Sequence, residues 1–237
     1  GDLDNNGDQN ALDVQEYVVG ILGSDLTPMP CNDVDQDGNL TVTDAALLAF
    51  CNYWNVYNHP PDSAAVHDHC NFPFLEIINP YDTVEFSIGA ADISAGWLDI
   101  HVRNPNRRML GYELKLEGVQ ITGVENLYDN AAYPVTPQFA FGTGHLMALS
   151  DVDSVVERGA AWKPLCRVNF TNPAETICIA EVVDVVNENY HNAITFLVDA
   201  CVSSTGVGQA ATDLGIRVFP NPATESTVIT YPPGLST

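Results

Sequence analysis

Hydrophobic positions have a helical periodicity in the first quarter of the chain. Apolar side chains recur there every three or four residues in two separate stretches, and this spacing places them along one face of a helix. The members of the two stretches are Val14, Tyr17, Val18, Ile21 and Leu22, then Ala46, Leu47, Phe50, Tyr53 and Trp54. The sequence therefore predicts two helices that bury these faces against each other, with the first helix ending at Gly23.

From Tyr81 to Ser203 the periodicity changes to alternation of apolar and polar residues, which predicts strands with one buried face. The expected strands cover residues 84–88, 98–102, 110–116, 145–149, 162–170, 177–186 and 194–202, with another near Ala140. Short strands in this number, without a helical pattern between them, predict an all-β sandwich or barrel of the jelly-roll kind. The predicted fold class is thus multidomain, with a small α module followed by an all-β sandwich.

A twelve-residue pattern occurs twice, over residues 2–13 and 33–44, and each copy runs into one of the predicted helices. Both copies have Asp at positions one, three and twelve, Asn or Asp at position five and Gly at position six. Calcium takes about six to eight oxygen ligands, so acidic side chains must converge while the glycine permits a tight turn. Each copy therefore predicts a calcium loop of the EF-hand type.

We expect one calcium ion in each loop, held by alternate side chains and one backbone carbonyl. For the first ion the expected ligands are Asp2, Asp4, Asn6, Asp13 and the carbonyl of Asp8, with Asn10 acting directly or through water. For the second they are Asp33, Asp35, Asp37, Asp44 and the carbonyl of Asn39, with Thr41 in the water-linked position. The second loop has more side-chain carboxylates than the first, so we expect it to bind calcium more tightly.

The duplicated loop-then-helix arrangement of residues 1–58 resembles dockerin type I modules. Each loop here ends in Asp, whereas the general EF-hand pattern ends in Glu. The resemblance implies two bound calcium ions and docking onto a cohesin module. In dockerins the residues just before the last ligand of each loop help to choose the partner. Those positions hold Ala11 and Leu12 in the first loop, and Val42 and Thr43 in the second.

Residues 81–203 resemble a divergent cohesin, or a carbohydrate-binding module of the same sandwich shape. The similar segments are residues 98–102, 110–116 and 160–170. Residues 214–223, which end in the turn Pro220-Asn221-Pro222-Ala223, and residues 226–231 resemble the opening of a C-terminal sorting domain for type IX secretion. The resemblance implies an apolar strand before this turn and a second alternating strand after it. The expected domains are therefore 1–58, the dockerin-like module; 59–80, a connector; 81–203, the sandwich; 204–213, a linker; and 214–237, the start of the sorting domain.

The chain is strongly acidic, with 8 Lys and Arg against 31 Asp and Glu and a formal net charge of −23. This balance argues against nucleic acid and anionic membranes as partners. No apolar run reaches the length of a membrane span. Six cysteines in such a chain indicate an oxidising compartment, so we expect an extracellular or cell-surface location.

Cys166 and Cys178 flank a turn signal at Asn172-Pro173, so we expect them to face each other across a hairpin and form a disulfide. Cys31, Cys51, Cys70 and Cys201 would then form the remaining bonds, and we favour a bridge among the first three of these. A zinc half-site in the segment His67–Cys70 is a weaker alternative, because further ligands at a recognisable spacing are missing.

The sequence contains no nucleophile elbow, phosphate loop or metalloprotease motif, so we expect no enzyme activity. An acid pair drawn from Glu113, Glu117 and Glu125, as in glycosidases, is a weaker alternative.

The favoured function is a secreted, calcium-dependent interaction protein whose module docks onto a cohesin-like sandwich in the same or a neighbouring chain. The proline-containing connector is expected to hinder docking within one chain, which favours head-to-tail assembly into rings or filaments. One alternative is a carbohydrate-binding, non-catalytic part of a secreted polysaccharide-degrading enzyme, in which exposed aromatic residues bind sugar. The candidates for that role are Trp97, Tyr128, Tyr133 and Trp162. Another alternative is a structural subunit of a surface layer or fibre.

Overall fold

The computed structural model describes residues 3, 6, 7, 10–29, 32–58, 78–128, 137–150, 155–203, 217–219 and 228–230. Its helices are α1 (Ala11–Gly23) and α2 (Val42–Asn58). The strands that follow are β1 (Ile78–Asp92), β2 (Trp97–Asn104), β3 (Met109–Glu117), β4 (Gln120–Asn126), β5 (Gln138–Phe139), β6 (His145–Leu149), β7 (Gly159–Thr171), β8 (Thr176–Asn187), β9 (Asn192–Leu197) and β10 (Cys201–Ser203). A separate pair is formed by β11 (Arg217–Phe219) and β12 (Val228–Thr230).

Helix α1 begins and ends where its sequence provides caps. The Asn10 side chain accepts a hydrogen bond from the first turn, and the Asp13 side chain accepts one from the Asn10 amide, which together form a capping box. The chain leaves the helix at Ser24, whose φ of 56° is left-handed, so the helix includes Gly23 as its last residue. The predicted apolar face of α1 is buried, and α1 packs against α2.

The strands of the middle region form one hydrogen-bonded path that folds over on itself into two facing layers. The strand order is β4-β7-β2-β1-β9-β8-β3-β6-β5, with β10 paired to β8. Strand β9 runs parallel to β1 and touches β8 through a single pair, so it joins the two layers at one side. The layers pack through alternating apolar residues, among them Phe86 of β1 and Tyr112 of β3, whose ring centroids lie 6.1 Å apart. The predicted β-sandwich is present.

Two details of the strand prediction were wrong. Strand β4 was not predicted, because it is an edge strand whose alternation is interrupted by Gly123 and by exposed polar positions. The single strand expected over residues 194–202 is two strands, β9 and β10, because Asp199 adopts a positive φ of 47° between them. The two strands that the sorting-domain resemblance implies within residues 214–231 are present as β11 and β12.

The predicted Cys166–Cys178 disulfide is wrong. Strand β7, which carries Cys166, pairs with β2 and β4, whereas β8, which carries Cys178, pairs with β3, β9 and β10. The segment through Asn172 therefore crosses between layers and does not close a hairpin. Cys178 lies opposite Cys201 of β10 and is bonded to it, while Cys166 is a buried free thiol. Cys51 is disulfide-bonded as well, and the zinc alternative at His67–Cys70 lies outside the described residues.

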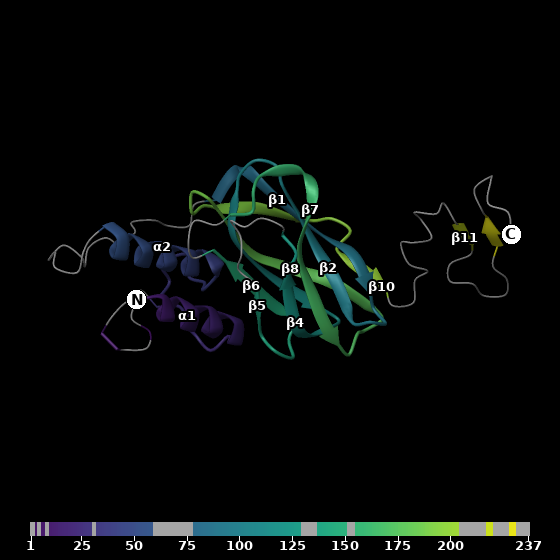
Figure 1. Ribbon diagram of the computed structural model, residues 1–237, viewed down its shortest axis with the longest axis horizontal. Coiled ribbons are helices and arrows are strands. Elements are labelled where there is room, and N and C mark those ends of the chain that lie inside the picture. Colours follow the sequence, from purple (N-terminus) through teal and green to yellow (C-terminus); the bar gives the residue numbers. More distant parts are fainter. Residues whose placement is uncertain are drawn as a thin grey trace.

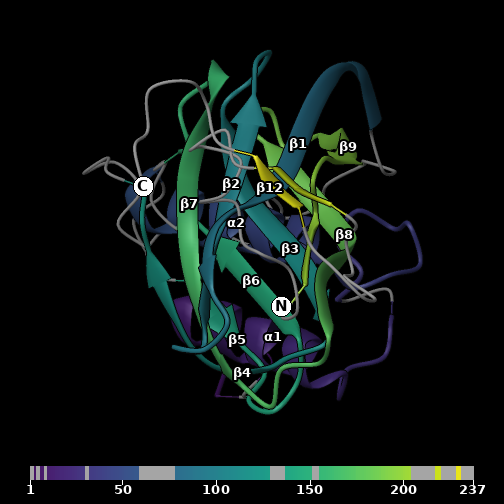
Figure 2. The ribbon, with the colours of Figure 1, turned by 90° about the vertical axis from the view of Figure 1, so that its right-hand side faces the viewer.

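Both helices lie against the layer that contains β3, β6 and β8 (Figure 1). Seen from the other direction, α1 and α2 lie behind β6 and β3 (Figure 2). The module is thus docked on the sandwich of its own chain, the arrangement that the connector was expected to hinder. Within the described residues, neither helix is long and apolar enough to cross a membrane.

Candidate functional site

Loop two gathers three carboxylates at one point. Single carboxylate oxygens of Asp33, Asp35 and Asp37 all lie within 4.8 Å of one another. Gly38 permits the turn that brings them together, since its φ of 90° is a conformation that residues with a Cβ rarely adopt. Asp33 Oδ1 and Asp35 Oδ2 are buried without a hydrogen-bond partner. Buried, unpaired carboxylate oxygens are unfavourable unless a cation accompanies them, so the donor set fits calcium.

The electrostatics of loop two agree with a cation site. Burial, together with the nearby charge of Asp37, raises the pKa of Asp35 to about 6. Burial also raises the pKa of Asp44 to about 7, against the hydrogen bond from the Thr41 amide that lowers it. These carboxylates therefore resist ionisation on their own, and a bound divalent cation would supply the charge that lets them ionise.

The aspartate at position twelve of each loop makes the same pair of hydrogen bonds. Asp44 accepts the amide of Val34 at 2.6 Å with one oxygen and the amide of Thr41 at 2.9 Å with the other. In loop one, Asp13 accepts the corresponding amides of Leu3 and Asn10, each at 2.7 Å. The repeat seen in the sequence is thus also a repeat in hydrogen bonding.

The structure supports the other predicted ligands less clearly than the three carboxylates of loop two. Asp2, Asp4 and Asp8 of loop one lie outside the described residues, and Asn6 is exposed. Asn10 caps α1 by accepting the Leu12 amide at 2.9 Å. In loop two, the Asn39 amide donates to Asp37, and the Thr41 hydroxyl faces the sandwich. Loop two is therefore the calcium candidate that the structure describes more fully.

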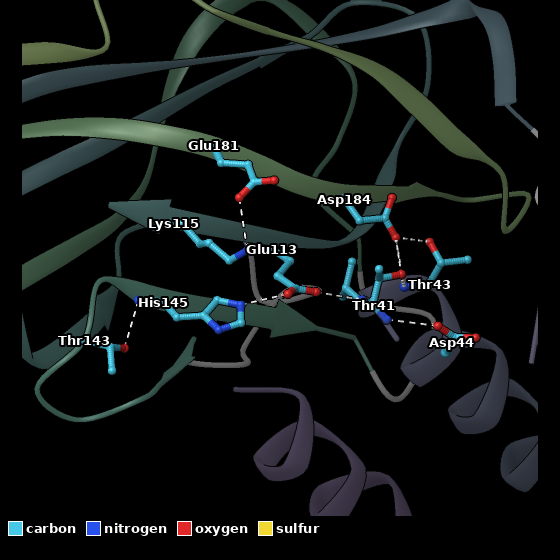
Figure 3. A network of polar contacts seen from close by, with 10 residues as sticks. Thr41, Thr43, Asp44, Glu113, Lys115, Thr143, His145, Glu181 and Asp184 are labelled. Atoms are coloured by element: carbon cyan, nitrogen blue, oxygen red, sulfur yellow. Dashed lines mark hydrogen bonds and ion pairs between the residues drawn. The ribbon is translucent and has the colours of Figure 1, made fainter. Parts of the chain in front are cut away.

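Two threonines near the end of loop two contact a buried carboxylate of the sandwich (Figure 3). Asp184 of β8 accepts the hydroxyl of Thr41 at 2.7 Å, and both the hydroxyl and the amide of Thr43, at 2.5 and 3.2 Å. Its second oxygen accepts the side-chain amide of Asn192 at 2.7 Å. One carboxylate of the sandwich thus satisfies several donors at the start of α2.

A second buried carboxylate receives the first amide of α2. Val42 N–H donates to Glu113 Oε2 at 3.0 Å, and Glu113 Oε1 lies 2.7 Å from His145 Nε2. The Glu113 side chain is only 2% exposed, and this burial raises its pKa, against the lowering effect of His145. The first amides of a helix lack partners within the helix and carry partial positive charge, so two carboxylates at this end stabilise it.

An apolar contact surrounds these polar bonds. Val42 is fully buried, and a Cβ added to Gly111 of β3 would lie 2.8 Å from its side chain, so the helix approaches the strand closely. The apolar faces of α1 and α2 share one cluster with Leu110, Met147, Leu149, Val155 and Val186 of the sandwich. Val42 and Thr43, to which the dockerin resemblance gives a part in partner choice, are therefore buried in the contact, whereas the corresponding Ala11 and Leu12 are exposed.

Sequence reasoning did not identify Asp184 or His145, and it considered Glu113 only as part of an acid pair. The signal available was an acidic residue between apolar neighbours within an alternating strand, at Tyr112-Glu113-Leu114 and Val183-Asp184-Val185. Such residues are rarely buried unless they are paired. Glu113 faces α2, whereas Glu125 accepts a bond from Asn169 of β7, in the other layer.

The aromatic residues proposed for sugar binding are engaged with cations. The guanidinium carbon of Arg167 lies 4.0 Å from the Trp97 ring centroid, and that of Arg103 lies 5.1 Å from Trp162. Lys163 Nζ lies 5.8 Å from the Tyr128 ring. Each of these rings therefore has one face occupied by a side chain. Tyr133 lies outside the described residues.

No family model matches the chain, and no curated protein sequence matches it. Among solved structures, it is similar to CaCohA2 from Clostridium acetobutylicum, with a TM-score of 0.39 and 11% identity over 54% of this chain and 94% of that chain. It is also similar to a non-cellulosomal cohesin from the hyperthermophilic archaeon Archaeoglobus fulgidus, with a TM-score of 0.34 and 9% identity over 58% of this chain and 96% of that chain. These TM-scores are too low to establish a shared fold.

Proposed function

We propose that this chain is a secreted, calcium-dependent protein–protein interaction protein, in which a dockerin-like module docks onto a cohesin-like sandwich. The observation that carries the proposal is the pair of buried carboxylates, Glu113 and Asp184, that receive the amides and hydroxyls at the start of α2. Donors and acceptors from segments far apart in the sequence match one another across an apolar contact. Such matching is typical of a recognition surface.

Calcium would act by shaping the docking segment. Thr41 belongs to loop two through its amide, which donates to Asp44, and to the interface through its hydroxyl, which donates to Asp184. An ion bound by the three clustered aspartates of loop two would hold this loop closed. It would thereby keep the hydroxyls of Thr41 and Thr43 in position to donate to Asp184. Removal of calcium is therefore expected to weaken docking and to lower the stability of the module itself.

The partner sandwich is the chain's own in this structure, and the same surfaces would serve a neighbouring chain. Head-to-tail assembly remains a prediction that depends on exchange of the module between chains. We also propose an extracellular location, supported by the disulfide between Cys178 and Cys201.

The test uses a matched pair of substitutions in the full chain. Val42→Asp places a carboxylate against Glu113 inside the contact, whereas Ala11→Asp changes the corresponding position of the first repeat, which is exposed. Small-angle X-ray scattering in calcium should show a larger radius of gyration for Val42→Asp and no change for Ala11→Asp. Chelation should expand the wild-type chain in the same direction.

Equal radii for the wild-type chain and both variants, with and without calcium, would contradict the proposal that calcium and the contact at Val42 hold the module on the sandwich. Circular dichroism of each variant checks that the helices and strands are retained.

A further inference from the structure

The turn between β8 and β9 places Tyr190 against the docked helix α2. The rings of Tyr190 and Phe50 have centroids 4.8 Å apart and an interplanar angle of 49°. A tilted aromatic pair of this kind adds to the free energy that burial alone contributes. Thr43, which donates to Asp184, lies seven residues before Phe50, and residues seven apart share one face of a helix. One face of α2 therefore contacts the sandwich with a hydroxyl at its start and with an aromatic ring two turns later.

Tyr190 has a backbone conformation that bulky residues rarely adopt. Its φ of 59° is left-handed, and such a conformation persists only where the surrounding structure holds it. The Tyr190 amide donates to the Asn187 carbonyl at 2.9 Å. The Asn187 side-chain oxygen accepts the amides of Asn189 and His191, at 2.8 and 3.2 Å. Hydrogen bonds to one asparagine therefore fix the backbone on both sides of Tyr190.

The sandwich itself anchors this turn. Asn187 is only 1% exposed, and its side-chain amide donates to Asp82 of β1 at 2.7 Å. The Glu188 amide donates to the Arg108 carbonyl at 3.0 Å, and the Glu188 carboxylate pairs with the Arg108 guanidinium. The partners in these bonds all belong to the sandwich, so the bonds do not depend on the module. The Tyr190 ring is thus positioned before the helix docks, and docking loses less conformational entropy.

The two repeats of the module differ at the positions that contact the sandwich here. The repeats are 31 residues apart, since their loops begin at residues 2 and 33. Thr43 and Phe50 of the second repeat therefore correspond to Leu12 and Val19 of the first. Leu12 is 63% exposed and Val19 is 55% exposed. The first repeat thus has neither a hydroxyl for Asp184 nor an aromatic ring for Tyr190 at these positions.

We propose that Tyr190 is a specificity-determining residue, which selects a docking helix with an aromatic side chain seven residues after the threonine that bonds Asp184. The turn fixes the backbone of Tyr190, so its ring cannot follow a helix that has a smaller side chain at that position. The second helix of this module meets the requirement and the first does not. The inference rests on the proposed docking function and adds to it the chemical class of helix that the sandwich accepts, whether from this chain or a neighbouring one.

Hydrogen exchange of the Val42 amide measures docking, because this first amide of α2 is bonded to Glu113 of the sandwich. We would measure it by NMR in the full chain, in calcium and at a single pH. Phe50→Leu removes the aromatic ring and keeps an apolar side chain, whereas Phe50→Tyr keeps a ring. Tyr190→Asn removes the ring of the sandwich, and asparagine tolerates the left-handed backbone. Val19→Leu is the matched control in the first repeat, and the Ala49 amide inside α2 reports whether the helix is folded.

Phe50→Leu and Tyr190→Asn are each expected to lower the protection of Val42 about tenfold, the scale of a lost aromatic pair. Phe50→Tyr and Val19→Leu should leave it unchanged to within about twofold. In the Tyr190→Asn background, Phe50→Leu should have little further effect. Equal losses from Phe50→Leu in both backgrounds, or no loss in either, would overturn selection by Tyr190 and leave docking intact. A Val42 amide that is unprotected in the wild-type chain, beside a protected Ala49, would overturn docking as well.

Discussion

At the level of single residues, the proposed calcium site of loop two depends on Asp35 and Asp44, whose ionisation is expected to couple calcium binding to pH. Burial is the main cause that raises their pKa values, to about 6 and about 7. Calcium takes carboxylates in the ionised form, so protons compete with it at these residues. The competition falls in a pH range that solution measurements reach easily.

Calcium affinity of the full chain is therefore expected to fall as the pH is lowered from 8 to 5.5. The fall should approach about tenfold per pH unit for each carboxylate that takes up a proton. Isothermal titration calorimetry at several pH values measures it, and the Asp35→Asn variant should show a weaker affinity with a shallower pH dependence. An affinity for loop two that does not change over this range would contradict the assigned ligands.

Without calcium, the free energy of unfolding is expected to increase as the pH is lowered, although calcium affinity decreases. Between the ordinary carboxyl pKa of 3.8 and the folded values of about 6 and about 7, the folded chain binds more protons than the unfolded chain. These two residues therefore lower the free energy of unfolding as the pH rises through that window. Urea unfolding of the chelated wild-type chain and of the Asp35→Asn variant should show a steeper decline in the wild-type chain.

At the level of secondary-structure elements, the pairing of β8 with β10 determines the covalent link of the sandwich. Cys178 and Cys201 face each other across these strands with their Cα atoms 4.1 Å apart. Cys166 lies in the other layer, fully buried, where burial raises the pKa of its thiol to about 12.

Loss of the link through a Cys178→Ser, Cys201→Ser double variant is expected to lower the free energy of unfolding by about 3 kcal/mol, because the closed loop no longer restricts the unfolded chain. Alkylation of the native wild-type chain should leave Cys166 unmodified until the sandwich unfolds. Urea unfolding measures the loss of stability, and peptide mapping under non-reducing conditions shows whether Cys166 is modified. A Cys166–Cys178 peptide would contradict the strand pairing.

The positions of the helices and of most strands were predictable from local pattern, whereas the partners of the strands were not. The apolar face of α1 and the alternation that marks β2 and β3 are local properties, and these elements appear where the sequence predicts them. The cap at Asn10 is also local, but Asn10 was predicted only as a calcium ligand. The pairing of β7 with β2 and β4 depends on long-range packing, which the turn signal at Asn172 does not encode. The role of Asp184 could not be predicted either, because it depends on long-range contacts. Asp184 accepts hydroxyls from Thr43 and Thr41, which lie 141 and 143 residues earlier in the sequence.

At the level of the whole molecule, an acidic helical module and a sandwich form one docked unit. Residues 1–58 contain no Lys or Arg, so the module meets the sandwich through apolar side chains, backbone amides and hydroxyls. The carboxylates of the contact, Glu113 and Asp184, belong to the sandwich and face the positive end of α2. This arrangement lets two acidic surfaces associate without a cationic side chain from the module.

The central claim is that this contact exists in solution, and a double-mutant cycle between Thr43 and Asp184 tests it most directly. Thr43→Val removes the hydroxyl donor and Asp184→Asn removes the charge that accepts it, both within the full chain in calcium. If the contact forms, urea unfolding should give a coupling energy of about 1–3 kcal/mol between the two substitutions. A cycle of Thr43→Val with Asp99→Asn, whose partner is Arg167 in the other layer, should be additive. Additivity of the Thr43 and Asp184 substitutions to within about 0.5 kcal/mol would contradict the docked arrangement.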